Sequence, residues 1–107
     1  MVIHRFEVYL VSLDPTVGSE IRKTRPCLVV SPDEMHENLR TVIVAPMTSQ
    51  GHVYPTRVRC RFRGKDGEVA LDQIRGVDRS RLIRKQGRLD RHTCSDVLRI
   101  LSEMFAP

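Results

Sequence analysis

The sequence predicts a small, mainly β protein of the α+β class: a curved antiparallel sheet or barrel with an amphipathic helix at its C-terminal end. Three observations support this prediction. Several short runs have the alternation or composition of strands, their connections are mainly of hairpin length, and the last segment changes to helical spacing. With 107 residues and no internal repeat, the chain is expected to form one domain over residues 1–107.

Three strands are expected in the first half of the chain. Arg5–Leu13 alternates with period two and carries apolar residues on both faces, which indicates a strand in the middle of the sheet. Cys27–Ser31 and Thr41–Ala45 are short β-rich runs. A proline follows each of them, and Pro32 and Pro46 are therefore expected to end these strands.

The second half predicts a hairpin and two further strands. Pro55–Arg63 shows the clearest alternation, because its four arginines fall on one face and its apolar residues on the other. Gly64–Gly67 contains an Asp-Gly pair and is expected to turn the chain back through Glu68–Leu71. Asp72–Val77 and Leu82–Leu89 are predicted as two more strands.

Two helical segments are expected. Apolar residues recur at helical spacing between Asp90 and Phe105, and Asp90 is a suitable N-cap for this amphipathic helix. The polar stretch Asp33–Asn38 can form one helical turn, with Ser31 or Asp33 as its cap.

Composition excludes several classes of protein. No apolar stretch approaches the roughly 20 residues of a membrane helix, and the first residues do not resemble a signal peptide. We therefore expect a cytoplasmic protein. The three cysteines include no close pair, and the four histidines show no metal-ligand spacing. No disulfide framework, metal or cofactor is expected.

The positive charge is concentrated in one part of the chain. Residues 57–91 contain 12 Lys or Arg against 5 Asp or Glu, a balance of +7, whereas the remainder contains 6 against 8, a balance of −2. This half should attract a polyanion, most plausibly nucleic acid, although simple solubility is the alternative. The arginine face of Pro55–Arg63 suits bidentate contact with phosphate, and a solvated edge strand is the competing interpretation.

Two polar loops give the strongest functional signal. In the first, Arg25 precedes Pro26, which biases the arginine toward extended backbone and gives its side chain a defined direction. In the second, Thr48 and Ser49 follow an apolar run. Taken separately, these are a solvated basic loop and a turn. If the two adjoining runs are neighbouring antiparallel strands, Arg25 should lie near Thr48 at one edge of the sheet.

This pair suits one reaction of RNA. The ribose 2′-OH can attack its own phosphate, so a protein need supply only alignment, charge stabilisation and proton transfer. Arg25 would neutralise charge that develops on the phosphate, and Thr48 would hold the phosphate in place. Arginine is a poor base because it stays protonated. Glu20 in the same loop or Asp72 after the run Glu68–Leu71 could act as the proton acceptor, and His52 is a weaker candidate.

The order of these motifs resembles that of the MazF/PemK (Kid-like) toxins of bacterial type II toxin–antitoxin modules. Each motif is weak alone, but their order and spacing make the resemblance fairly specific. The matching segments span nearly the whole chain and are Val8–Pro15, Gly18–Pro26, Val29–Pro32, Val44–Ser49, Tyr54–Pro55, Gly67–Gln73 and Leu82–Leu89 with the terminal helix.

The resemblance implies an SH3-like β-barrel, a homodimer, and metal-independent cleavage of single-stranded RNA at a short sequence, which leaves a 2′,3′-cyclic phosphate and a 5′-hydroxyl. It implies Arg25 and Thr48 as the catalytic pair and Glu20 as an acidic residue involved in activity. The implied partner is a short MazE-like antitoxin whose acidic C-terminal tail covers the basic groove. Residues expected to contact RNA are Ser19, Arg22, Lys23, Thr24, Ser49, Gln50, Arg57, Arg59, Asp72 and Gln73.

The chain departs from the family pattern at one position. Kid-like toxins carry an arginine two residues before the acid that Asp72 matches, whereas this chain has Ala70. The alternative functions are a non-catalytic nucleic-acid-binding protein and a CcdB-like inhibitor of DNA gyrase, and the latter class lacks the nuclease pair.

Overall fold

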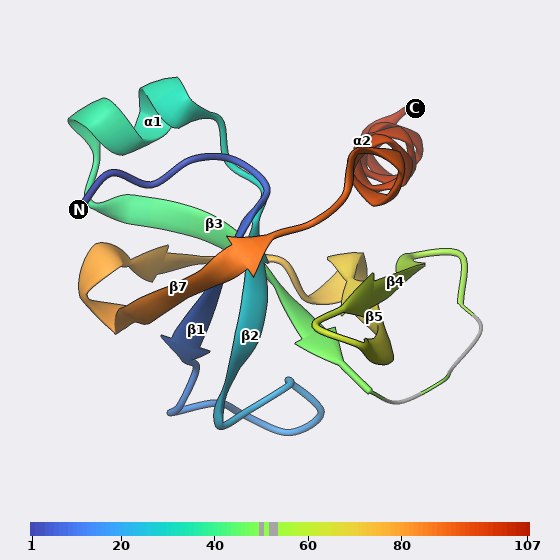
Figure 1. Cartoon of the computed structure of the whole chain (residues 1–107), viewed down its shortest axis with the longest axis horizontal. Coiled ribbons are helices and arrows are strands. Elements are labelled where there is room, and N and C mark those ends of the chain that lie inside the picture. The colour runs from blue at the N-terminus through green and yellow to red at the C-terminus, as the bar shows by residue number, and fades with distance from the viewer. Residues whose placement is uncertain (50, 52–53) are drawn as a thin grey trace.

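The computed structural model, which describes residues 1–49, 51 and 54–107, confirms a mainly antiparallel β fold with a C-terminal helix (Figure 1). Its strand path runs β4-β5-β3-β2-β1-β7, and β6 pairs with β3 beside this path. The elements are β1 (Glu7–Ser12), β2 (Thr24–Val29), α1 (Asp33–Asn38), β3 (Thr41–Thr48), β4 (Arg57–Phe62), β5 (Lys65–Ala70), the 3₁₀ turn η1 (Leu71–Gln73), β6 (Arg75–Asp78), the 3₁₀ turn η2 (Arg79–Arg81), β7 (Leu82–Arg88) and α2 (Arg91–Phe105).

The strand β3 joins the two parts of the sheet. It pairs with β2 as far as Cys27 opposite Pro46, and then pairs with β5 from Met47 opposite Val69. The expectation that Pro46 ends this strand is therefore wrong. Pro46 lacks an amide N–H, and so does Pro26 in β2, so the β2–β3 ladder stops here while β3 continues by changing partner. The sheet divides at this point.

The central strands are buried on both faces. Val8 of β1 packs in a cluster with α2 residues such as Val97, whereas Tyr9 and Val11 pack in a second cluster on the other side of the sheet. The strand β1 lies between β2 and β7, which confirms its predicted central position. Helix α2 covers the first cluster and stands over β4 (Figure 1).

The β4–β5 turn differs from the sequence prediction. It consists of Arg63 and Gly64, whose φ angles of 53° and 77° are both in the left-handed region. A two-residue turn of this kind fits the right-handed twist of the flanking strands. The strand β5 therefore already begins at Lys65, and the Asp66–Gly67 pair lies inside it. Similarly, the segment predicted as a strand from Asp72 starts as a 3₁₀ turn, and β6 begins three residues later.

The two helices begin differently. The Asp90 carboxylate accepts a hydrogen bond from the Thr93 amide at 3.0 Å, which confirms Asp90 as the N-cap of α2. Helix α1 starts after Pro32 without a side-chain cap, so the expected cap by Ser31 or Asp33 is not formed. In residues 1–49, 51 and 54–107, no helix combines the length and apolar character needed to cross a bilayer.

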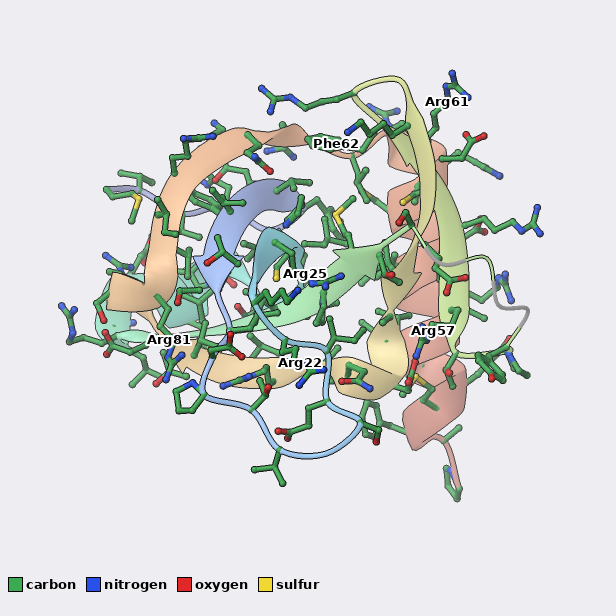
Figure 2. All side chains as sticks on the ribbon, turned by 90° about the horizontal axis from the view of Figure 1, so that it is seen from below. Arg22, Arg25, Arg57, Arg61, Phe62 and Arg81 are labelled. Carbon is green, nitrogen blue, oxygen red and sulfur yellow. The ribbon has the colours of Figure 1, made fainter. Side chains whose placement is uncertain are left out.

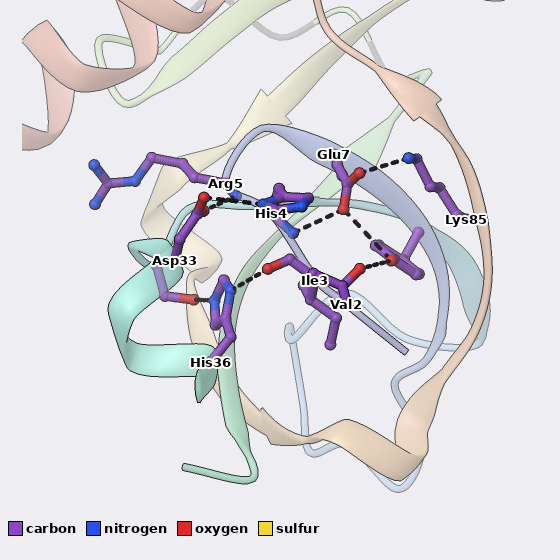
Figure 3. Close-up of polar contacts among 10 residues, drawn as sticks. Val2, Ile3, His4, Arg5, Glu7, Asp33, His36 and Lys85 are labelled. Carbon is purple, nitrogen blue, oxygen red and sulfur yellow. Dashed lines mark hydrogen bonds and ion pairs between the residues drawn. The ribbon is translucent and has the colours of Figure 1, made fainter. Parts of the chain in front are cut away.

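A polar network fixes the N-terminal segment against α1 and β7 (Figure 3). The buried Glu7 carboxylate accepts a hydrogen bond from the His4 amide at 2.7 Å and pairs with Lys85 at 2.6 Å. The buried His36 ring bonds through Nδ1 to the Ile3 carbonyl at 2.7 Å and through Nε2 to Ser31 Oγ at 2.6 Å. Since the carbonyl only accepts, Nδ1 carries a proton, and in the neutral imidazole Nε2 then accepts from Ser31. Every polar group named here has a partner.

Candidate active site

A cavity of about 360 Å³ opens where the sheet divides. We call it the Arg25 cavity. Arg25 and Pro26 of β2 line one side, while Thr48 at the end of β3 lines another. The β2–β3 register of Cys27 opposite Pro46 would, if continued by two residues, set Arg25 opposite Thr48. The structure thus brings together the two residues that the sequence predicted to be neighbours.

The Arg25 guanidinium is anchored at one atom and open at the others. Its Nε donates to the Arg22 carbonyl at 3.0 Å, which holds the side chain against its own loop. Within the part of the chain that the structure describes, its two terminal nitrogens have no acceptor, carboxylate or ring partner. Arg25 lies near the middle of the face seen in Figure 2. This half-buried fork can receive two oxygens of a phosphate.

Thr48 is held by a close backbone contact. It pairs with Glu68 in the β3–β5 ladder, and the neighbouring Gly67 lies directly beneath its carbonyl. A Cβ atom at Gly67 would stand only 2.7 Å from the Thr48 carbonyl oxygen, so only glycine allows this approach. Ser49 follows and also lines the cavity.

Arg57 lies in a different electrostatic setting from Arg25. Its guanidinium binds Asp72 through Nε at 2.6 Å and Nη2 at 3.1 Å, and binds Glu68 through Nη1 at 3.2 Å. Only 12% of its side chain is exposed, and Glu68 is more deeply buried at 3%. The hydrogen bond from Arg57 holds the pKa of Asp72 below its usual value, with a further contribution from Thr56. Contact of Arg57 and Asp72 with RNA remains a prediction, and both side chains are already paired.

Several arginines already form ion pairs or hydrogen bonds within the protein. Arg61 pairs with Asp66 at 2.8 Å, and Arg75 donates to the Leu13 carbonyl at 3.0 Å. Arg79 and Arg81 donate to backbone carbonyls on other segments in the same way. Arg63 belongs to the turn rather than to the strand. Of the predicted arginine face, Arg59 is exposed and lines a second cavity beside the Arg25 cavity.

The loop between β1 and β2 is braced from a distance. Gln73 accepts a hydrogen bond from the Ile21 amide at 2.8 Å and donates to the Ser19 carbonyl at 3.3 Å. Glu20 accepts from the Val17 amide at 2.6 Å within the same loop, and does not line the Arg25 cavity. The exposed residues Arg22 and Lys23 complete the loop, and the exposed Thr24 begins β2.

Several cavity residues were not found from the sequence. Glu68, Lys65, Phe62 and Gln86 all line the Arg25 cavity. Strand alternation predicts which side of its strand Glu68 or Phe62 occupies, but it does not show that this side lies against Arg25. Two predicted positions, Gln50 and His52, lie outside the described residues.

The cysteines behave as buried apolar residues. Burial raises the pKa of the Cys27 thiol to about 12 and that of Cys60 to about 11, and neither of these nor Cys94 forms a disulfide. Among residues 1–49, 51 and 54–107, no three His, Cys, Asp or Glu side chains converge as a metal site requires.

Fold and cavity together define a small curved-sheet protein with an open arginine and a hydroxyl side chain at the place where its sheet divides. These features define a class of β-sheet protein in which an arginine and a hydroxyl group can together bind a phosphate.

The chain belongs to the family described as PemK-like, MazF-like toxins of type II toxin–antitoxin systems, whose family model matches residues 4–105. The endoribonuclease EndoA of Bacillus subtilis (strain 168) is 37% identical over 97 residues, which cover 84% of this chain and 83% of EndoA. The endoribonuclease PemK of Escherichia coli is 46% identical over 50 residues, or 47% of this chain and only 38% of PemK.

Solved structures confirm the fold. MazF from Deinococcus radiodurans superposes with a TM-score of 0.86 at 25% identity, covering 97% of this chain and 96% of that one. A mycobacterial endoribonuclease in complex with its cognate antitoxin superposes with a TM-score of 0.83, covering 98% and 97%, and at 20% identity it supports the fold alone. The chain is thus a homologue of toxins named as endoribonucleases, which favours the nuclease interpretation over a gyrase inhibitor.

Proposed function

We propose that this toxin cleaves single-stranded RNA at the Arg25 cavity, through attack of the ribose 2′-OH on the adjacent phosphate. The products are a 2′,3′-cyclic phosphate and a 5′-hydroxyl, and the consequence for the cell is inhibited translation and growth. One observation carries the proposal: the terminal nitrogens of Arg25, without partners in the described part of the chain, open into the cavity that Thr48 also lines. Family membership supports the reaction class.

The cavity supplies charge and position. As the 2′-oxygen adds, negative charge grows on the two non-bridging phosphate oxygens, and the planar Arg25 fork can hold both. Thr48 hydrogen-bonds the phosphate and fixes the in-line geometry. Since the 2′-OH is the nucleophile, the reaction needs no nucleophile from the protein.

We assign proton acceptance to Glu20. Glu20 does not line the Arg25 cavity, so its carboxylate would have to leave the Val17 amide and reach the ribose hydroxyl when RNA binds over the β1–β2 loop. Asp72 is the weaker base, since the Arg57 hydrogen bond lowers its pKa and occupies both its oxygens. The acid limb of the pH–rate profile tests this assignment: Glu20→Gln should remove it, whereas Asp72→Asn should leave it in place.

We further propose one cytoplasmic domain that acts as a homodimer and is held inactive by a MazE-like antitoxin. The structures of related toxins with their antitoxins support such a partner. The exposed Arg59 and the loop of Arg22 and Lys23 would attract its acidic C-terminal tail. The proposed RNA contacts are those predicted from the sequence.

Incubation with single-stranded RNA in EDTA tests the proposal. The wild type should produce cyclic-phosphate ends, and Arg25→Ala should reduce the cleavage rate about 10²–10³-fold, as expected for loss of a group that stabilises developing charge. Arg99→Ala, at an exposed arginine on α2 that pairs with Glu103, is the matched control and should cleave normally. Uncut but retained RNA would indicate a binding protein, and inhibition of gyrase without any RNA interaction would support the CcdB-like alternative.

A further inference from the structure

Gln86 occupies an irregular position in β7. Val8 of β1 lies opposite Gly87, but the next residue, Tyr9, lies opposite Lys85, so Gln86 is the extra residue of a β-bulge. A bulge residue leaves the regular alternation of its strand, and bulges commonly redirect a side chain near a site. Here the redirected side chain lines the Arg25 cavity, although β7 is not a neighbour of β2 or β3.

The Gln86 amide is incompletely satisfied. Its Oε1 is buried and has no hydrogen-bond partner within the described residues. Such an oxygen costs free energy unless something binds it. Rotation about the last side-chain bond brings Oε1 out of its buried position, so that the edge of the amide, with one acceptor and one donor, faces a molecule in the cavity.

The surroundings of Gln86 suit a flat apolar group. Phe62 and Met47 line the same cavity. Gly87 has a φ angle of 149°, and a Cβ atom there would lie 3.3 Å from the Phe62 ring, so the bulge packs directly against this aromatic side chain. An aromatic ring beside a side-chain amide is the combination that holds an unstacked base in single-stranded RNA.

We propose that Gln86 is a specificity-determining residue that binds the base of a nucleotide next to the scissile phosphate. The base carries an exocyclic amino group beside a ring nitrogen, as adenine and cytosine do: Oε1 accepts from the amine and Nε2 donates to the ring nitrogen. The Asp66 carboxylate lines the same cavity and can accept the second hydrogen of such an amino group, which the carbonyl edge of uracil does not offer. This inference rests on the proposed cleavage of RNA.

Cleavage of a randomised RNA library, with the cut sites sequenced, is the first test. Wild type and Gln86→Met, which keeps length but removes both polar atoms, are compared with Asn38→Leu, a distant exposed amide on α1, as the matched control. The wild type should prefer adenine or cytosine at one position beside the cut by about 10-fold or more. Gln86→Met should lose this preference at that position alone, and the control should keep it.

Removal of the amino group from the substrate is the second test. Purine riboside replaces adenosine, or 2-pyrimidinone riboside replaces cytidine, at the position found. Wild-type cleavage should fall about 10-fold, whereas Gln86→Met should cleave both substrates equally. An unchanged preference in Gln86→Met, or an equal loss of cleavage at every sequence in a folded variant, would overturn the inference. Absence of any cleavage by the wild type would instead overturn the proposed function.

Discussion

Arg25 and Arg57 are both partly buried arginines on the face seen in Figure 2, yet their partners differ completely. Arg57 binds Asp72 with two nitrogens and Glu68 with the third. Among the described residues, Arg25 uses Nε alone, on the carbonyl of Arg22 in its own loop. The Arg57 guanidinium therefore stabilises the fold, whereas the terminal nitrogens of Arg25 can bind an anion.

The comparison shows why local charge is a poor guide to binding capacity. The balance of +7 over residues 57–91 includes arginines that hold backbone carbonyls, such as Arg75 and Arg81. The residue that we assign to the phosphate lies outside this segment. A phosphate site therefore depends less on how many cations a segment has than on which of them lack a partner.

Removal of Arg57 is expected to have the largest effect on stability. Arg57→Met leaves the buried Glu68 carboxylate without its partner, and the free energy of unfolding should fall by about 3 kcal/mol. Arg25→Met breaks one surface hydrogen bond and should cost less than about 1 kcal/mol. Urea denaturation of both variants measures the difference. Equal losses of unfolding free energy in the two variants would contradict the different roles assigned to Arg57 and Arg25.

Gly67→Ala should be the next largest effect. The new Cβ would meet the Thr48 carbonyl at 2.7 Å, so the backbone of β3 or β5 must shift, at a cost of about 2 kcal/mol. Because the shift moves Thr48, the cleavage rate should fall as well. Gly51→Ala, where no atom of the described residues lies within 4 Å of the added Cβ, should change the unfolding free energy by less than about 0.5 kcal/mol. Equal unfolding free energies for the two alanine variants would contradict the assigned contact.

Lowering the pH should weaken the ion pair between Arg57 and Asp72. The folded pKa of Asp72 lies below its ordinary value of 3.8, so its contribution to stability is present above that pH and is lost as the pH falls through the folded pKa. In Arg57→Met, the cause of this shift is absent. Denaturation midpoints measured between about pH 6 and pH 2 should therefore fall less steeply for Arg57→Met than for the wild type. Parallel curves would mean that the ion pair does not set the pKa of Asp72.

The smallest effect is expected at Gln73. Gln73→Leu removes the bonds to Ile21 and Ser19 that brace the loop of Arg25, which should cost about 1 kcal/mol and speed amide hydrogen exchange of Ile21. If Gln73 acts only by contacting RNA and does not brace the loop, hydrogen exchange in the free protein should stay unchanged while affinity falls.

The sequence predicted those features that depend on local periodicity. Alternation identified the central strand β1, and the apolar spacing with Asp90 identified α2 and its cap. The predicted juxtaposition of Arg25 and Thr48 also follows from strand order, since antiparallel neighbours bring their opposite ends together.

Other features depend on pairing between strands, which a single sequence does not display. Pro46 was expected to end a strand because a proline breaks one ladder, but β3 acquires a second partner in β5. The position of Gln86 depends on a register shift opposite Tyr9 that leaves no mark on the pattern of β7. Likewise, the pairing of Arg57 with Asp72 follows from the η1 turn rather than from a strand.

An NMR titration tests the central claim most directly. The guanidinium signals of ¹⁵N-arginine-labelled protein are followed while RNA with a 2′-deoxy nucleotide at the cut site, which blocks cleavage, is added. The Arg25 signals should shift most, with saturable binding, and the Arg57 signals should shift less, because the Arg57 nitrogens are already paired with Asp72 and Glu68. Shifts at Arg57 without shifts at Arg25 would contradict the assignment of the open guanidinium as the phosphate site.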